Sequence, residues 1–234
     1  MSAQTVVILG GRVGGIVAAN ELARRLPEPH RVVLVERSPR HAFAPSFLWL
    51  MTGDRTAAQV TRDLRSLIRP RVEIVQAEAR SIDWAKRRVE ADGRGIDFDH
   101  LVIAPGDVTS IPLPGGWKPD VPLMLPKAGV FAHAQAQVVA RRIAAEALGR
   151  PTRDGFCGDG YCMLEGGEDV AGFAFGNFFA EPSPDVRLKR VGRAWHLGKV
   201  LFERWWLAPV GLRRRALQAA LEWGARAYGA RVSL

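Results

Sequence analysis

The sequence predicts an α/β fold, and three observations within its first forty residues carry this prediction. A short, β-branched apolar run from Thr5 to Leu9 stops at glycines, as a strand buried on both faces does. Helical spacing of apolar residues follows from Gly14 to Leu26, and Pro27 ends that helix. A second buried strand, Arg31 to Glu36, ends on an acid. Together these segments predict a β-α-β unit that begins a Rossmann-like domain.

The middle of the chain predicts further elements of the same domain. A helical stretch around Thr56 to Ile68 precedes a short strand from Val72 to Val75. Residues Ser81 to Asp99 alternate between polar and apolar types and turn at Asp92-Gly93, which predicts a small antiparallel meander. His100 to Ala104 is another buried strand. The predicted domain therefore combines a parallel sheet with a separate β-meander.

The later segments predict a helix, a β-rich region and a tail. After a proline-rich loop, the alanine-rich stretch from Ala128 to Leu148 predicts a helix that Gly149 closes. Phe156 to Ala180 carries many glycines and aromatic residues and predicts strands joined by tight turns. Two prolines near residue 184 mark a boundary. We expect a Rossmann-like domain over 1–150, a β-rich segment over 151–184 and a helical tail over 185–234.

Composition narrows the class of protein. The 234 residues are 47% hydrophobic and 24% charged, which is typical of a globular protein with a sizeable core. No run of 18 apolar residues is present, and the first strand-like run begins at Thr5, so we expect neither a transmembrane helix nor a signal peptide. The expected location is the cytoplasm. Two cysteines, Cys157 and Cys162, are too few for a disulfide framework, and their spacing does not indicate a zinc site.

The basic charge is concentrated in the tail. From residue 184 onward there are eleven Lys and Arg against three acids, so +8 of the net charge of +9 lies there. Trp195 to Leu207 is rich in apolar residues, and Gly211 to Tyr228 has an amphipathic pattern. This pattern favours helices over 195–228 that lie on an anionic membrane surface, which would place the protein peripherally on the inner membrane face. The alternative is a helical pair packed on the domain with a solvated basic face. No nucleic-acid partner is expected, because no binding module accompanies the charge.

A glycine-rich turn joins the first strand to the first helix. Its residues are Gly10, Gly11, Arg12, Val13, Gly14 and Gly15. The amino end of the helix offers free N–H groups and a positive dipole to a pyrophosphate. Glu36, at the end of the second strand, stands where a carboxylate accepts hydrogen bonds from an adenosine ribose. The turn therefore indicates a site for a cofactor that contains ADP, against the alternative of a simple tight turn.

Arg12 departs from the dinucleotide-binding pattern. It occupies the middle glycine position of the GxGxxG arrangement, where the missing side chain normally makes room for the pyrophosphate. Two outcomes are open. Either the guanidinium swings outward and adds a charge-assisted bond to phosphate, or affinity for the cofactor falls.

Several segments together form a recognisable set, namely the glycine turn, Glu36-Arg37, 41–55, 101–106, 106–112 and 126–136. This set resembles one known family, the sulfide:quinone oxidoreductase-like flavoproteins of the pyridine nucleotide-disulfide oxidoreductase group. The resemblance implies FAD as cofactor, with Asp107 bound to its ribityl chain, Lys127 near the flavin ring, Pro45 and Ser46 along the ring, and the backbone at Ala79 near adenine. The full set of expected cofactor-binding residues is Gly10, Gly11, Arg12, Gly14, Gly15, Glu36, Arg37, Pro45, Ser46, Ala79, Gly106, Asp107 and Lys127.

The resemblance extends to the carboxyl-terminal part. Residues 160–182 and 195–207 look like the family segments that follow the flavin site, and Cys162 falls on a cysteine that takes part in sulfur chemistry there. The resemblance implies an oxidoreductase at a membrane surface. Electrons would pass from a small reductant, either sulfide or thiol or a reduced nicotinamide, through FAD to quinone. Cys162 is the candidate catalytic residue.

One departure from the family is large. The strand that ends at Gly106 and the Gly-Asp segment that begins there are separate in relatives, with a middle domain of more than a hundred residues between them. Here they share Gly106, so the central, second dinucleotide-binding domain is absent. The family partner of Cys162 would lie in that domain, although Cys157 could substitute, and a homo-oligomer could supply the missing surface. The alternative function is a non-catalytic or degenerate, even deliberately minimal, flavin-binding scaffold without a complete substrate site.

Overall fold

The computed structural model describes residues 2–103, 109–116, 121–230, 232 and 234. Four parallel strands form the central sheet, in the order β5-β2-β1-β9. They are β1 (Thr5–Leu9), β2 (Arg31–Val35), β5 (Glu73–Val75) and β9 (His100–Ile103). The predicted parallel sheet is confirmed.

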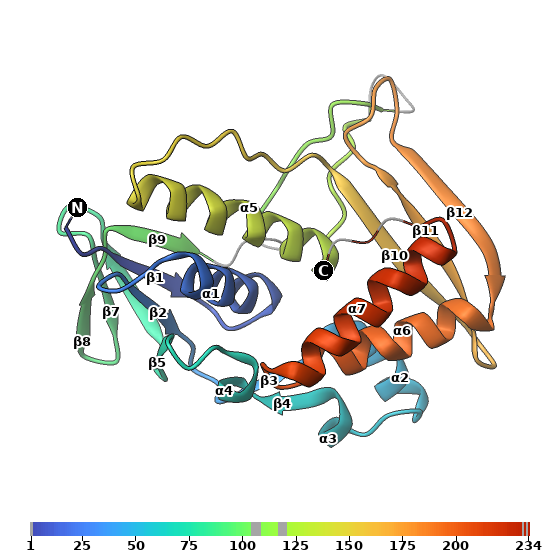
Figure 1. The fold of residues 1–234 in the computed structure, drawn as a ribbon, viewed down its shortest axis with the longest axis horizontal. Coiled ribbons are helices and arrows are strands. Elements are labelled where there is room, and N and C mark those ends of the chain that lie inside the picture. Colours follow the sequence, from blue (N-terminus) through green and yellow to red (C-terminus); the bar gives the residue numbers. More distant parts are fainter. Residues whose placement is uncertain (1, 104–108, 117–120, 231, 233) are drawn as a thin grey trace.

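The two faces of this sheet are covered differently. Val6, Ile8 and Leu34 point to one side, where α1 (Val13–Arg25) and α5 (Gly129–Ala147) complete the main core. Val7 and Val33 alternate with them and point to the other side, against the meander. In Figure 1, α1 and α5 lie next to each other beside the sheet. Because both faces are covered, the strands are almost entirely apolar.

The meander has the predicted form. Its strands are β6 (Ala79–Asp83), β7 (Arg88–Ala91) and β8 (Arg94–Asp97), paired antiparallel. The turn between β7 and β8 places Asp92 at φ 46° and Gly93 at φ 77°. Two successive positive φ values are typical of the hairpin turn that Asp-Gly favours.

The helix predicted over 56–68 is wrong as one continuous element. The structure divides it into α3 (Ala57–Val60), β4 (Thr61–Asp63) and α4 (Leu64–Leu67). β4 pairs antiparallel with β3 (Arg40–Ala42), a strand that the sequence analysis did not predict. The short helices η1 (Ala44–Ser46) and α2 (Phe47–Thr52) follow β3. This small subdomain sits at the carboxyl end of β2.

A second antiparallel sheet follows α5. It consists of β10 (Asp159–Gly167), β11 (Val170–Asn177) and β12 (Asp185–Gly192), in that order. β12 is a correction, because the sequence analysis placed 185–192 in a helical tail. Among the residues that the structure describes, the sheet of β1, β2, β5 and β9 is the sole parallel sheet.

Two helices close the fold. They are α6 (Arg193–Trp206) and α7 (Leu212–Ala227), and α6 packs on both β11 and α7 (Figure 1). Trp205 and Trp206 are 2% and 1% exposed and belong to the same core as α1 and α5. Part of the apolar face of the tail is therefore buried against the rest of the protein. In the described ranges, every helix is too short or too polar to cross a bilayer.

Candidate functional site

The glycine turn brings β1 and α1 into close contact. Gly10 has φ 96° and donates its N–H to the carbonyl of Val35 at 2.9 Å, which ties the turn after β1 to the end of β2. A Cβ on Gly15 would lie 1.8 Å from the carbonyl oxygen of Gly10. A side chain at position 15 would therefore force β1 and α1 apart. Gly15 therefore has the packing role expected of the third glycine in a dinucleotide turn.

Arg12 is accommodated in this turn without strain. It is the N-cap residue of α1, with φ −85° and ψ −172°, and it is exposed. Its extended backbone suits any residue. No side chain caps α1, and its first turn contains no acid. The amino end of α1 therefore keeps its N–H groups for an anionic ligand.

Glu36 is tied to the turn in a way that the sequence did not reveal. Its Oε2 accepts the N–H of Gly11 at 2.5 Å, and its Oε1 accepts the N–H of Ser38 at 2.9 Å. Each carboxylate oxygen has a second lone pair, so the group retains capacity for other donors. Gly14, two residues after Arg12, is buried within α1.

A buried hydrogen-bonded chain links the turn to α6. The indole Nε1–H of Trp206 donates to Nε2 of His41 at 3.0 Å, and Nδ1 of His41 lies 3.1 Å from the carbonyl oxygen of Gly11. An indole N–H can only donate, so Nε2 is unprotonated and Nδ1 carries the hydrogen. Burial lowers the pKa of His41, although the bond to Gly11 acts in the opposite direction. No sequence pattern indicates this chain, because Trp206 and His41 are distant in sequence.

Ser46 is a predicted site residue whose buried hydroxyl lacks a hydrogen-bond partner in the part of the chain that the structure describes. It is 1% exposed, and its Oγ has no hydrogen-bond partner among the described residues. Buried polar groups are normally hydrogen-bonded, so this hydroxyl is left able to bond a ligand. Its neighbour Pro45 and the residue Arg37 are exposed. Ala79 is exposed on β6 and pairs with Ala91.

Two of the expected site residues lie outside the described residues. These are Gly106 and Asp107, in the segment between β9 and the loop that leads to α5. Lys127 is described and stands two residues before α5 begins, close to the helix start expected from the sequence. It is exposed, and its Nζ donates to the carbonyl of Thr109 at 2.6 Å.

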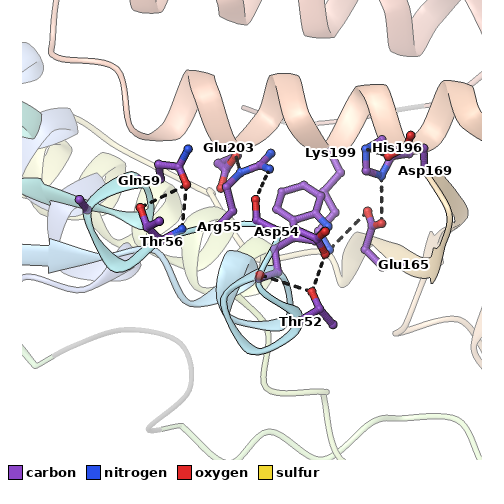
Figure 2. A network of polar contacts seen from close by, with 12 residues as sticks. Thr52, Asp54, Arg55, Thr56, Gln59, Glu165, Asp169, His196, Lys199 and Glu203 are labelled. Carbon is purple, nitrogen blue, oxygen red and sulfur yellow. Dashed lines mark hydrogen bonds and ion pairs between the residues drawn. The ribbon is translucent and has the colours of Figure 1, made fainter.

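A cluster of charged side chains lies around Trp49 on α2. Its members Arg55, Lys199 and Glu203 are labelled in Figure 2. The guanidinium of Arg55 and the ammonium of Lys199 lie 4.5 and 4.4 Å from the centre of the Trp49 ring. Arg55 also donates from Nε to Oε2 of Glu203 at 3.0 Å. Lys199 and Glu203 are both buried on α6. The aromatic ring therefore holds two cations in place.

Glu165 on β10 connects this cluster to the second sheet. Its carboxylate lies 3.0 Å from Nδ1 of His196 and 3.5 Å from Nζ of Lys199. Asp169 lies 3.5 Å from the other ring nitrogen of His196 (Figure 2). Burial lowers the pKa of Lys199, whereas Glu165 acts in the opposite direction. No local sequence pattern brings Glu165, His196 and Lys199 together.

Cys162 lies beside the charged cluster. It is exposed on β10, opposite Ala174, while packing around its thiol raises its pKa and Lys199 acts to lower it. Cys157 is also exposed, and its thiol donates to Oδ2 of Asp159 at 3.3 Å. Both thiols are free. The structure therefore shows no disulfide between the two cysteines.

α6 joins the glycine turn to the charged cluster. Lys199 and Trp206 are seven residues apart on this helix, which puts them on one face and about 10 Å apart along its axis. One end of that face contacts the turn through His41, and the other approaches Cys162.

Residues 4–164 match the family described as Pyridine nucleotide-disulphide oxidoreductase. The chain is 34% identical over 106 residues to the sulfide-quinone reductase of Aquifex aeolicus, which covers 44% of this chain and 24% of that protein. It is 32% identical over 120 residues to the demethylphylloquinone reductase NdbB of a Synechocystis species, covering 47% of this chain and 30% of that one. Each alignment thus spans less than a third of the relative's length.

The fold has a counterpart among solved structures. The X-ray structure of the sulfide:quinone oxidoreductase from Aquifex aeolicus superposes with a TM-score of 0.71 at 16% sequence identity. The superposition covers 87% of this chain and 90% of that chain. At 16% identity, this similarity is evidence for a shared fold alone.

Proposed function

We propose, from the finding that this chain belongs to the pyridine nucleotide-disulphide oxidoreductase family, that it transfers electrons from a small reductant to a quinone. FAD is the cofactor that family membership assigns to it. When bound, FAD accepts and donates electron pairs. The observation that carries the proposal is the geometry of the glycine turn. Gly15 allows β1 and α1 to pack closely, and no side chain caps the amino end of α1.

The residues at the turn fit an FAD. The uncapped helix end would take the pyrophosphate through backbone N–H groups, and the exposed guanidinium of Arg12 would add a charge-assisted bond from outside. Glu36 would hold the ribose with its free lone pairs. The unpartnered hydroxyl of Ser46 would donate to the ring system. The other predicted contacts remain part of the proposal: Gly10, Gly11, Gly14, Arg37, Pro45, Ala79, Gly106, Asp107 and Lys127.

We assign the sulfur chemistry to Cys162. Its thiol adjoins Lys199, whose positive charge favours the thiolate that reacts. Burial opposes thiolate formation by raising the pKa of Cys162, so the amount of thiolate depends on the positive charge of Lys199. Glu165 and Glu203 in turn keep Lys199 charged, because their negative charges stabilise its buried ammonium group and raise its pKa. The donor in this proposal is sulfide, a thiol or a reduced nicotinamide.

Exposed apolar groups support a quinone and a membrane surface as partners. On α2, Met51 is 77% exposed and Phe47 and Leu48 are each 42% exposed. On α7, Leu212 and Trp223 are 82% and 74% exposed, and Arg213, Arg215 and Arg226 are exposed too. Apolar and basic side chains together favour the interface of an anionic bilayer.

Anaerobic reduction followed by quinone addition tests this function. With FAD bound, sulfide or a reduced nicotinamide should bleach the flavin band, and a short-chain quinone should restore it. Cys162→Ser should slow bleaching by sulfide and leave bleaching by dithionite unchanged. Cys157→Ser is the matched control and should behave as the unaltered chain does. A flavin that no biological reductant bleaches would contradict the proposal.

A non-catalytic flavin scaffold is the second candidate. The observation that favours it is that the described residues contain one dinucleotide-type sheet, so a second site for nicotinamide is not among them. Both cysteines are also free rather than paired. A scaffold would bind FAD with the same affinity but would show neither bleaching by sulfide nor reoxidation by quinone.

A further inference from the structure

A cavity of about 180 Å³ lies away from the glycine turn, at the junction of α1, α5 and α7. Its walls include Asn20 on α1, Gln137 on α5 and Gln218 on α7. None of the residues that line it belongs to the turn, to 36–46 or to the charged cluster. Its volume is below the roughly 300 Å³ at which drug-sized pockets begin. The cavity therefore suits a small group.

The charge around this cavity is net positive. Arg69, Arg214 and Arg215 line it. Glu21 lines it as well, but its carboxylate is already engaged by Arg24 at 2.7 Å and Arg25 at 3.1 Å. No ion pair involves any of the three lining arginines in the part of the chain that the structure describes. An anion in the cavity would supply the missing negative charge.

Arg214 has the strongest need for such a partner. Its guanidinium packs over the rings of Trp205 and Trp206 at 5.3 and 5.5 Å, and its Nη1 is buried without a hydrogen-bond acceptor. Burial, together with the charge of Arg69, lowers the pKa of Arg214 to about 10. A buried cation without a counterion is unfavourable, and a planar guanidinium is well matched to the oxygens of phosphate.

Two more buried nitrogens at this cavity lack partners. Nε1 of Trp205 and Nδ1 of His133 have no hydrogen-bond partner among the described residues, and the two side chains are 2% and 9% exposed. Both residues line the cavity. The indole is a donor only, and the imidazole donates in either its protonated form or one neutral tautomer. Together with Arg214, these groups form a built set of donors rather than a chance charged surface.

The amino end of α7 contributes to the same wall. Gly211 is its N-cap residue and lines the cavity, and no side chain caps this 16-residue helix. Its first turn contains no acid. The free N–H groups and the positive end of the dipole therefore belong to the same cavity wall as Arg214, Trp205 and His133.

We propose that this cavity binds a phosphate group, held by Arg214, Trp205 and His133 at the amino end of α7. The group belongs either to free phosphate or to the headgroup of a lipid, since both present the same oxygens. The site is separate from the cofactor turn and does not depend on the oxidoreductase activity.

Titration with inorganic phosphate at constant ionic strength tests the proposal directly. The indole N–H resonance of Trp205, assigned with Trp205→Phe, should shift saturably in ¹H–¹⁵N spectra of the full chain. Arg214→Gln should weaken binding by about tenfold, the value of one lost charge-assisted bond. Arg213→Gln, on the same helix but away from the cavity lining, should leave binding within about twofold.

Two outcomes would overturn the proposal. One is a Trp205 resonance that phosphate does not move. The other is a shift of the Gly11 amide alone, which would place phosphate at the glycine turn instead. If Arg214→Gln does not fold, Arg69→Gln serves as the second variant and should also weaken binding.

Vesicles distinguish the two sources of phosphate. Cosedimentation with phosphatidylcholine vesicles that contain phosphatidic acid, abolished by inorganic phosphate and by Arg214→Gln, would assign the site to a lipid headgroup. Binding of inorganic phosphate without this competition would assign it to free phosphate.

Discussion

The hydrogen bond from Trp206 to His41 joins residues 165 positions apart and fixes the tautomer of a buried histidine. Trp206→Phe keeps an aromatic ring but removes the donor, which leaves Nε2 of His41 unpaired. We expect a loss of about 1–3 kcal/mol in the free energy of unfolding, measured by urea denaturation. Trp223→Phe is the control, because Trp223 is 74% exposed, and it should change stability by less than about 0.5 kcal/mol. Equal losses in the two variants would contradict the assignment.

Lys199 sets the reactivity of Cys162 in this account. In a Cys157→Ser background, Lys199→Met removes the charge that lowers the pKa of Cys162, so that pKa should rise further. Alkylation by iodoacetamide near pH 8 should therefore slow by several-fold, because the thiolate is the reactive form. Lys189→Met on β12 is the control and should alkylate at the original rate. Equal rates in all three proteins would show that Lys199 does not tune the thiol.

The sequence revealed the residues of the site whose roles are local. Gly10, Gly15 and Glu36 belong to one contiguous β-α-β pattern, and their geometry agrees with it. The hydrogen bond from the N–H of Gly11 to Glu36 could not be predicted, because a hydrogen bond leaves no pattern in the sequence. The contacts of His41 and Lys199 depend on α6 folding back onto the domain. No periodicity encodes such a long-range contact.

Gly15 tests the close contact between β1 and α1. Gly15→Ala places a Cβ within 1.8 Å of the Gly10 carbonyl, so the strand and helix must separate. We expect a loss of about 1–3 kcal/mol in the free energy of unfolding and weaker binding of FAD. The matched control is Gly198→Ala on α6, where a Cβ meets nothing within 4 Å. That variant should gain about 0.5–1 kcal/mol, since alanine favours a helix. A stable, FAD-binding Gly15→Ala variant would contradict the account.

At the level of elements, periodicity predicted the buried strands and long helices but failed for 56–68. Val60, Leu64 and Leu67 have helical spacing and are all buried. Thr61 to Asp63 instead pairs with β3, and the side chain of Asp63 caps α4 by accepting the N–H of Arg65. Pairing with a distant strand therefore overrode local spacing. β12 had a local signal, the alternation of Val186 and Leu188 with basic residues, which the basic charge of the segment obscured.

The stability of the whole molecule should depend on two buried histidines. Burial lowers the pKa of His41 and lowers that of His133 to about 4. The unfolded chain therefore binds more protons than the folded protein below about pH 6.5. The contribution of the neutral rings is fully present above that pH and is lost as the pH falls toward 4.

Urea denaturation in phosphate-free buffers between pH 7.5 and pH 4 measures this dependence. The difference in stability between the original chain and His133→Leu isolates one ring from the carboxylates that titrate in the same range. That difference should change with pH below about 6.5 and stay constant above it. Parallel curves over the whole range would show that His133 is not held neutral by the fold.

A dinucleotide over the amino end of α1 is the central feature of the proposed function. Titration of the cofactor-free chain with FAD, followed by flavin fluorescence and repeated in the presence of ADP, measures this most directly. We predict one FAD per chain, competition by ADP because both ligands use the turn, and strongly weakened binding in Gly15→Val. FAD binding that ADP does not displace and that Gly15→Val leaves unchanged would contradict the placement of the cofactor.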